Sequence, residues 1–296
     1  MRVSEDAFKR AKRFILNNAR LLDRRLFEYQ FAGGSADAVI AALRAYQNAD
    51  GGFGNALEAD IRCPQSQPVP AEVAMLVMDR IGKFDVDIVY GVLQYLESIA
   101  VPGGGFPRAH RSINDSPHAE WWTTERDGDG SLNPTGRIVG LLLKQTAAPL
   151  AEHPPGWFAE AIDFVWDSLG QANGSDYHDL VQCIAFLQHA PDRTRAQEWL
   201  ARVDEWLGKP GVIAFDPHAA GYVHKVLDWA PTPDSYCAKL FTDEIVAGHL
   251  DALIEAQQDD GGWPMFWPAL SPAAELEWRG SITVDRLVTL KAYGRL

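Results

Sequence analysis

Two acidic residues in one short segment, Glu58 and Asp60, are the side chains of this chain best placed for acid–base chemistry. Arg62 follows two positions later, so the arginine could lower the pKa of one carboxyl group while burial raises that of the other. Two carboxyl groups with separated pKa values supply a general acid and a partner that orients it. The alternative is a loop in which both acids bind backbone amides and pair with Arg62.

A second candidate segment contains His118, Trp121 and Trp122. Histidine exchanges protons near neutral pH, and an indole ring offers a flat face for stacking or for stabilising a cation. We therefore expect His118 to act as base or acid and the two tryptophans to contact substrate. The alternative is a lid whose tryptophans pack over the protein core.

Further candidates stand where predicted helices begin or in the last long loop. Asp176 is the fourth catalytic candidate, although an aspartate that precedes a helix is most often an N-cap. The candidate substrate-binding residues are Arg62, Trp121, Trp122, Asn133, His178, His218, Tyr222, Trp263 and Trp278.

Metal-binding patterns in the sequence are incomplete. Asp127, Asp129 and Ser131 resemble the start of a calcium-binding loop, but Leu132 and Ile138 occupy the positions at which that motif needs glycine and glutamate. We therefore expect neither a metal nor another cofactor at the site.

Three nearly identical segments separate the elements that must position these residues. Residues 45–53, 101–107 and 256–264 each follow an apolar helical stretch and combine two or three consecutive glycines with an aromatic residue. Segments that recur about every 50 residues indicate a repeat architecture. The long interval between the second and third segments predicts two more units, at 153–158 and 209–212.

The hydrophobic periodicity is helical along the whole chain. Ser4 is a candidate N-cap for a first helix that ends near Gly33, and further helices are predicted at about 35–48, 68–81, 86–99, 133–146, 156–170, 175–190, 193–207, 217–229, 241–258 and 279–294. Helix pairs at a regular interval predict an all-α fold, an (α/α)6 toroid built as a double ring of six hairpins, in one domain over residues 1–296. An open solenoid is the alternative.

Three predicted connections, at 49–67, 100–132 and 259–278, are much longer than the others. Long loops inside a compact helical domain tend to be functional. Each of the three follows the same member of a helix pair, so in a ring they would surround one opening. The helix N-termini that point into this opening would favour anions.

Two of the repeated segments carry a recognisable pattern. Gln47-x-x-x-Gly51-x-Phe53 and Gln257-x-x-x-Gly261-x-Trp263 resemble the Gln-Trp repeat of squalene-hopene cyclases and related class II terpene cyclases, a superfamily that includes the β subunits of protein prenyltransferases. The resemblance implies an alpha-alpha barrel in which the glutamine binds a helix end, the glycine permits the turn and the aromatic ring stacks on the neighbouring unit.

The resemblance also implies a function. It predicts a terpene cyclase-like enzyme, an isomerase or lyase, that acts on a small hydrophobic or isoprenoid substrate by acid-initiated chemistry. Glu58 or Asp60 would donate the proton, and Trp121, Trp122, Trp263 and Trp278 would line the cavity. The Asp-x-Asp-Asp motif by which class II cyclases protonate their substrates does not occur in this sequence, and Asp234 and Cys237 have the wrong spacing for a prenyltransferase zinc site.

Two other functions stay open at this point. The segment from Gly261 to Pro268 resembles part of certain pectate lyases, which are also helical toroids, and tryptophans commonly stack on sugar rings. This favours a carbohydrate-active toroid, a polysaccharide lyase or glycosidase. A non-catalytic binding module is the third possibility, because a fold alone does not determine activity.

Composition limits the class of partner. The formal charge is −13, from 27 basic and 40 acidic residues, without a strongly basic cluster, so a nucleic-acid partner is not expected. No apolar run is long enough to span a bilayer, and three cysteines far apart in the sequence fit reduced thiols. We expect a cytoplasmic protein with a small-molecule substrate, whose oligomeric state the sequence leaves open.

Overall fold

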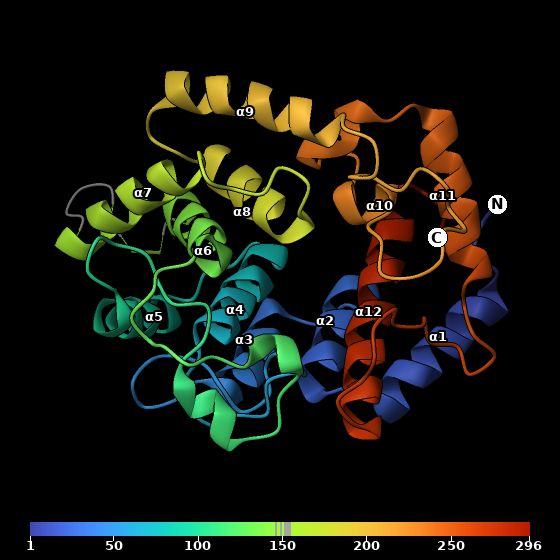
Figure 1. Cartoon of the computed structure of the whole chain (residues 1–296). Coiled ribbons are helices and arrows are strands. Elements are labelled where there is room, and N and C mark those ends of the chain that lie inside the picture. Colours follow the sequence, from blue (N-terminus) through green and yellow to red (C-terminus); the bar gives the residue numbers. More distant parts are fainter. Residues whose placement is uncertain (146, 149, 151–154) are drawn as a thin grey trace. The chain divides into compact units, whose positions relative to one another are not determined.

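The computed structural model describes residues 1–145, 147–148, 150 and 155–296. Within these residues the regular secondary structure is helical and contains no strand, which confirms the all-α prediction (Figure 1). Four short 3-10 helices, η1 (Arg44–Tyr46), η2 (Arg111–Asp115), η3 (Glu120–Trp122) and η4 (Tyr236–Leu240), accompany the α-helices. The α-helices are α1 (Glu5–Asn18), α2 (Leu21–Phe31), α3 (Ala36–Leu43), α4 (Pro68–Arg80), α5 (Val86–Ile99), α6 (Leu132–Lys144), α7 (Gly156–Ser168), α8 (Tyr177–Leu187), α9 (Arg193–Leu207), α10 (Val226–Trp229), α11 (Asp243–Glu255) and α12 (Pro272–Ala292).

The chain folds into two compact units. Unit 1 comprises Met1–Val39 and Gly208–Leu296, and unit 2 comprises Ile40–Leu207. The order of the helices is compatible with an all-helical toroid, because the three long connections precede the even-numbered helices α4, α6 and α12. The (α/α)6 arrangement and the single domain stay predictions.

Side-chain caps fix the start of several helices. Ser4, Asp85, Asp176, Thr242 and Ser271 each accept a hydrogen bond from the backbone N–H three residues later, at the starts of α1, α5, α8, α11 and α12. These bonds satisfy donors that the first helical turn leaves without an intrahelical partner. The helix starts are therefore encoded locally.

Unit 2 is built on three neighbouring helices. α6 packs between α4 and α8, while α7 packs on α6 and α9 packs on α8 (Figure 1). The close approach of α6 to α8 depends on Gly140, where a Cβ atom would lie 2.4 Å from the carbonyl oxygen of Ala185. Hydrogen bonds between their second turns bring the N-terminal ends of α4, α6 and α8 together.

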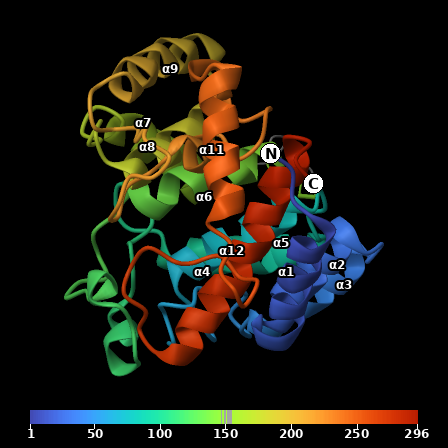
Figure 2. The same cartoon turned by 90° about the vertical axis from the view of Figure 1, so that its right-hand side faces the viewer.

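Unit 1 contains α1, α2 and α12, which pack on one another (Figure 2). It also contains a second pair formed by α10 and α11. α12 contacts the chain at the break between α1 and α2, because Gly280 lies against Ala19. Ala19 and Arg20 have extended backbone angles. The single first helix predicted from the sequence is therefore two helices.

The three glycine-rich segments form the same turn. Gln47 and Gln257 donate hydrogen bonds to the carbonyl oxygens of Gly51 and Gly261, at 3.0 and 2.9 Å. Gly51, Gly104 and Gly261 have φ values of 85°, 83° and 93°, a region that favours glycine. A Cβ atom at these three glycines would lie 2.1, 2.2 and 2.4 Å from backbone atoms of α5, α7 and α1. The repeat therefore fastens each turn to a helix that is distant in the sequence.

At the two intermediate repeats, Gly156 and Gly211 do not approach a helix as the other repeat glycines do. In the repeat predicted at 153–158, His153 and Pro154 lie outside the described residues. Its Gly156 begins α7, whereas the glycines of the other repeats follow a helix. The corresponding connection follows α7, and a Cβ atom at its Gly174 would lie 2.7 Å from the ring of Trp206. Gly211 lies in the expected connection, but a Cβ atom there would meet nothing within 4 Å.

Two predicted helix boundaries were wrong. Only Val226–Trp229 of the range 217–229 is helical, because Asp216 binds the backbone N–H of His218 and Gly221 adopts a φ of 85°. The last helix starts earlier than position 279, since Ser271 caps it and a proline follows. Trp278 consequently lies on α12 and not in a loop.

Candidate active site

Four polar side chains form a network at the N-terminal ends of α4, α6 and α8. Arg137 of α6 donates to a carboxylate oxygen of Glu72 of α4 at 3.0 Å, and Gln182 of α8 donates to the same oxygen at 2.8 Å. Gln182 also donates to the side-chain oxygen of Asn133 at 3.3 Å. Glu72 and Gln182 are buried, so their partners compensate for lost hydration.

Helical spacing explains part of how the network assembles. Gln182 lies one turn after His178 on α8, and residues four apart share one face of a helix. α8 therefore presents His178 and Gln182 on the same side. Asn133 has non-helical backbone angles of φ −95° and ψ 112° and joins the network through the hydrogen bond from Gln182.

His178 stands at the start of α8 beside this network. Its side chain is exposed, yet partial loss of hydration lowers its pKa below the ordinary 6.5. Asp176 and Glu72 oppose this shift, whereas Arg108 and Arg137 add to it. The ring is therefore mostly neutral at pH 7 and can accept a proton, and two carboxylates are close enough to stabilise the imidazolium that would form.

Arg108 supplies a positive charge that acts on His178. Its guanidinium lies 5.0 Å from the ring centroid of Trp122, and its charge influences the pKa of His178. No carboxylate in the described part of the chain pairs with Arg108. An exposed arginine held on an aromatic ring can bind a carboxylate or phosphate through two parallel hydrogen bonds.

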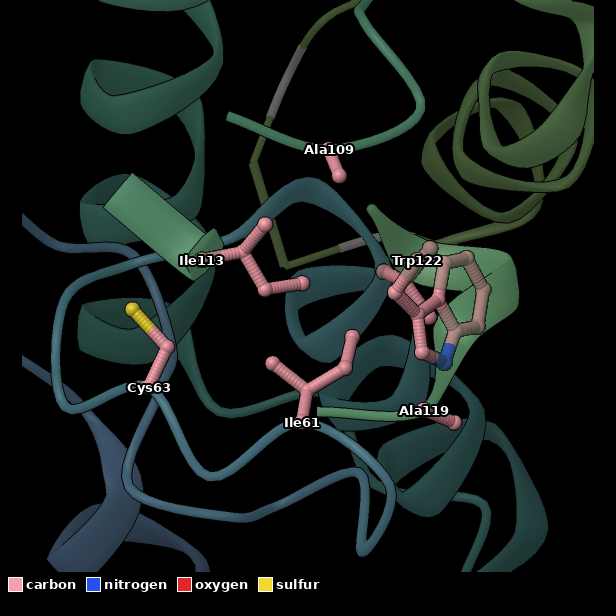
Figure 3. Packing of buried hydrophobic residues seen from close by; sticks show 7 residues of the cluster. Ile61, Cys63, Ala109, Ile113, Ala119 and Trp122 are labelled. Carbon is pink, nitrogen blue, oxygen red and sulfur yellow. The ribbon is translucent and has the colours of Figure 1, made fainter. Parts of the chain in front are cut away.

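Trp122 is held by a hydrophobic cluster. The cluster contains Ile61, Cys63, Val69, Ala109, Ile113, Ala119 and Trp122, and Figure 3 shows the indole beside Ile61 and Ala119. Trp122 is 9% exposed, whereas Trp121 is 43% exposed. The buried Trp122 therefore provides the ring on which Arg108 lies, and Trp121 is the indole that is open to solvent.

The loop that carries Glu58 and Asp60 is tied to the loop that carries Trp122. The carbonyl oxygen of Asp60 accepts from the backbone N–H of Ala119, and the backbone N–H of Arg62 donates to Pro117, both at 3.0 Å. Within its own loop, the Glu58 carboxylate accepts from the N–H of Asp60 at 2.7 Å. Both acids are buried. Because the backbone hydrogen bonds join the two loops, the loops together support Trp122.

His118 uses both ring nitrogens within its own loop. Nδ1 donates to the carbonyl oxygen of Ser116 at 2.7 Å, which leaves Nε2 of the neutral ring to accept from the hydroxyl of Thr123 at 2.9 Å. These bonds fix the loop. The arrangement supports the lid alternative, while the catalytic role of His118 stays a prediction.

The remaining candidates belong to unit 1. His218 and Tyr222 are exposed, and Trp278 lies 5.1 Å from the ring of Trp267. Trp263 is 2% exposed and donates from Nε1 to the carbonyl oxygen of Leu253 at 2.7 Å. Trp263 is thus anchored on α11, and the stacking on a neighbouring unit that the resemblance implies stays a prediction.

Glu72, Arg108, Arg137 and Gln182 are site residues that the sequence reasoning missed. Arg137 and Gln182 could have been found, because they lie four positions after the candidates Asn133 and His178 in the sequence. Glu72 lies in the second turn of a predicted helix. Arg108 had no such signal, since the path of its loop depends on contacts distant in the sequence.

Replacing Asp176 with alanine should have two effects. Loss of the cap to the N–H of Asp179 should lower the free energy of unfolding by about 1 kcal/mol, as measured by urea denaturation. Asp176 also raises the pKa of His178, so the variant should show a lower His178 pKa in an NMR titration. An unchanged or higher His178 pKa would contradict the proposed electrostatic role.

Comparison with protein-family models, curated proteins and solved structures found no match for this chain. The terpene cyclase resemblance accordingly stays an expectation. Across the described ranges, no group of three or more histidine, cysteine or acidic residues is arranged to hold a metal ion. None of the helices in the described part of the chain combines the length and hydropathy of a membrane-spanning segment.

Proposed function

We propose that this chain is a lyase that cleaves an acidic sugar chain by β-elimination, with Arg108 and His178 as its principal residues. The observation that carries the proposal is Arg108, a guanidinium that is held on Trp122 without a carboxylate partner among the described residues, and whose charge acts on a histidine of lowered pKa. One group binds an anion and the other accepts a proton. These are the two requirements for removing a proton from the carbon next to a carboxylate.

In the proposed mechanism, Arg108 binds the carboxylate of a uronate residue. Its positive charge stabilises the negative charge that develops on the carboxylate as the neighbouring C5–H bond breaks. Trp122 holds the guanidinium in place. The network of Glu72, Arg137 and Gln182 fixes the first two turns of α6 and α8, so that Asn133 and His178 keep their positions around the sugar ring.

Neutral His178 then accepts the C5 proton. The electron pair of the C5–H bond forms the C4–C5 double bond, and the C4–O bond to the departing sugar breaks. Asp176 and Glu72, which raise the pKa of His178, stabilise the imidazolium during this step. His178 returns the proton to the departing oxygen, so the reaction consumes neither water nor an oxidant.

The polarity of this site favours a carbohydrate over an isoprenoid. A carbocation would be repelled by two arginines, whereas hydroxyl and carboxylate groups suit the polar side chains present. The cavity of unit 1 beside Trp263 encloses about 70 Å³, which is room for two waters of ~30 Å³ each. Small-molecule sites usually measure about 300 Å³ or more. Acid-initiated chemistry by Glu58 or Asp60 stays a prediction with less support.

Replacing Arg108 with glutamine should lower kcat/KM on a uronate oligosaccharide about 10- to 100-fold, because a charge-assisted pair of bonds contributes about 1.5–3 kcal/mol. Arg108 also lowers the pKa of His178, so the acidic limb of the pH profile should move to higher pH. Arg13, an exposed arginine of unit 1, provides the matched control, Arg13→Gln. Equal activity of the two variants would remove Arg108 from the mechanism.

A further inference from the structure

Two hollows adjoin the proposed site in unit 2. The first measures about 400 Å³ and is lined by Arg108, Thr123, Arg126, Asp129, Gly130 and Ser131, among others. The second measures about 480 Å³ and is lined by Gly130, Ser131, Phe164, Asp167, Gln171 and Asp179, among others. Both lie within the usual size range of ligand sites, about 300–1,000 Å³.

The two hollows meet at one stretch of backbone. Gly130 and Ser131 line both of them, and the N–H of Ser131 donates to the carbonyl oxygen of Phe106 at 2.8 Å. Gly130 lies against the ring of Phe164, so a Cβ atom there would be 2.8 Å from that ring. The backbone shared by the two hollows is therefore held in place, and Gly130 has no side chain that would obstruct a ligand crossing it.

Each hollow borders an element of the proposed site. Arg108, which binds the carboxylate in the proposed mechanism, lines the first hollow. Asp179, in the first turn of α8 beside His178 in the sequence, lines the second, whereas His178 itself lines neither. A ligand that occupied both hollows would consequently contact the anion-binding arginine and the first turn of the helix that carries the base.

The two hollows differ in charge. The first contains Arg108 and Arg126 together with the carboxylates of Glu125 and Asp129, and Arg126 pairs with Asp129 at 3.3 Å. The second contains the carboxylates of Asp167 and Asp179 and no basic residue. Arg108, which has no carboxylate partner among the described residues, favours an acidic sugar in the first hollow. An uncharged sugar, whose hydroxyl groups donate to carboxylates, is favoured in the second.

We propose that the substrate is an extended chain in which acidic and uncharged sugars alternate, bound across both hollows at Gly130 and Ser131. This inference rests on the proposed function for its reaction, but it concerns binding and is tested by binding. In this arrangement Arg126 contacts the acidic sugar, and Asp167 and Gln171 contact the uncharged sugar.

The test measures dissociation constants by calorimetry in the His178→Ala background, in which substrate is not consumed. The probes are a disaccharide and two tetrasaccharides, one of uronate alone and one in which glucuronate alternates with an uncharged sugar. We expect the alternating tetrasaccharide to bind at least about tenfold tighter than either other probe. Asp167→Asn should reduce its preference over the all-uronate chain, and Arg126→Gln should weaken both tetrasaccharides.

Asp163→Asn is the matched control, because Asp163 is an exposed aspartate of α7 that does not line the hollow. Equal affinity for all three probes, or no binding, would overturn the extended-chain inference. Tight binding of the alternating tetrasaccharide without release of an unsaturated product by the unmodified protein would uphold this inference and refute the proposed elimination. Cleavage by the unmodified protein, with affinities that do not depend on the length or charge of the probe, would uphold the proposed elimination and refute the extended-chain inference.

Discussion

Replacing His178 with alanine is expected to lower kcat on an acidic oligosaccharide by about 10²- to 10⁴-fold, the usual contribution of a positioned general base. The variant should keep its fold, because the side chain is exposed and its helix starts at the cap of Asp176. The measurement is the initial rate of product formation, together with the circular dichroism spectrum.

The pH profile supplies a second readout of the same group. The base must be neutral, and loss of hydration lowers the pKa of His178 below 6.5. Activity should therefore persist as the pH falls to 6.5 and decline only as it falls through the lowered pKa. The unmodified protein should show this acidic limb in kcat/KM.

His189 provides the matched control for these experiments. It lies in the same unit just beyond the other end of α8, and its pKa is also lowered by loss of hydration. His189→Ala should keep kcat within about twofold, since most surface changes have small effects. A rate for His178→Ala that equals that of His189→Ala would show that His178 is not the base.

The second large effect is expected at Gly51. A methyl group there would lie 2.1 Å from the carbonyl oxygen of Gly91 in α5, and alanine disfavours the φ of 85°. Overpacking costs about 1–3 kcal/mol and the left-handed conformation about 1–2 kcal/mol. Gly51→Ala should therefore lower the free energy of unfolding by about 2–5 kcal/mol, as measured by urea denaturation.

Gly82 separates the two causes. It has a φ of 63°, but a Cβ atom there would meet nothing within 4 Å. Gly82→Ala should thus lose only the conformational part, about 1 kcal/mol. If Gly51→Ala were no less stable than Gly82→Ala, the turns would not be fastened to the neighbouring helices in the manner described.

The repeat was predictable because its chemistry is local. Gln47 and Gly51, like Gln257 and Gly261, are four residues apart and bind each other within one turn. The prediction of a repeat turn at 153–158 was wrong because it rested on spacing alone. Gly156 begins a helix, while Gly174, at the equivalent connection, lacks the neighbouring residues that define the motif.

The site was predictable only in part. Asn133, Asp176 and His178 were found because helix starts have sequence signals. Glu72 and Arg108 were missed because helices and loops distant in sequence bring them there, and no periodicity records such contacts. Glu58 and Asp60 were predicted to be catalytic because they lie in a long loop. The sequence could not show that they are buried, with exposed fractions of 7% and 2%.

The most direct test of the central claim is the chemistry of bond cleavage. The unmodified protein would be incubated with an alternating acidic tetrasaccharide in heavy-oxygen water, and its products analysed by mass spectrometry and ultraviolet absorbance. Elimination at His178 and Arg108 predicts a product with a new C4–C5 double bond and no heavy oxygen in either fragment beyond what the reducing end of an intact sugar exchanges with the same water. Heavy oxygen in a saturated product would mean hydrolysis and would contradict the account.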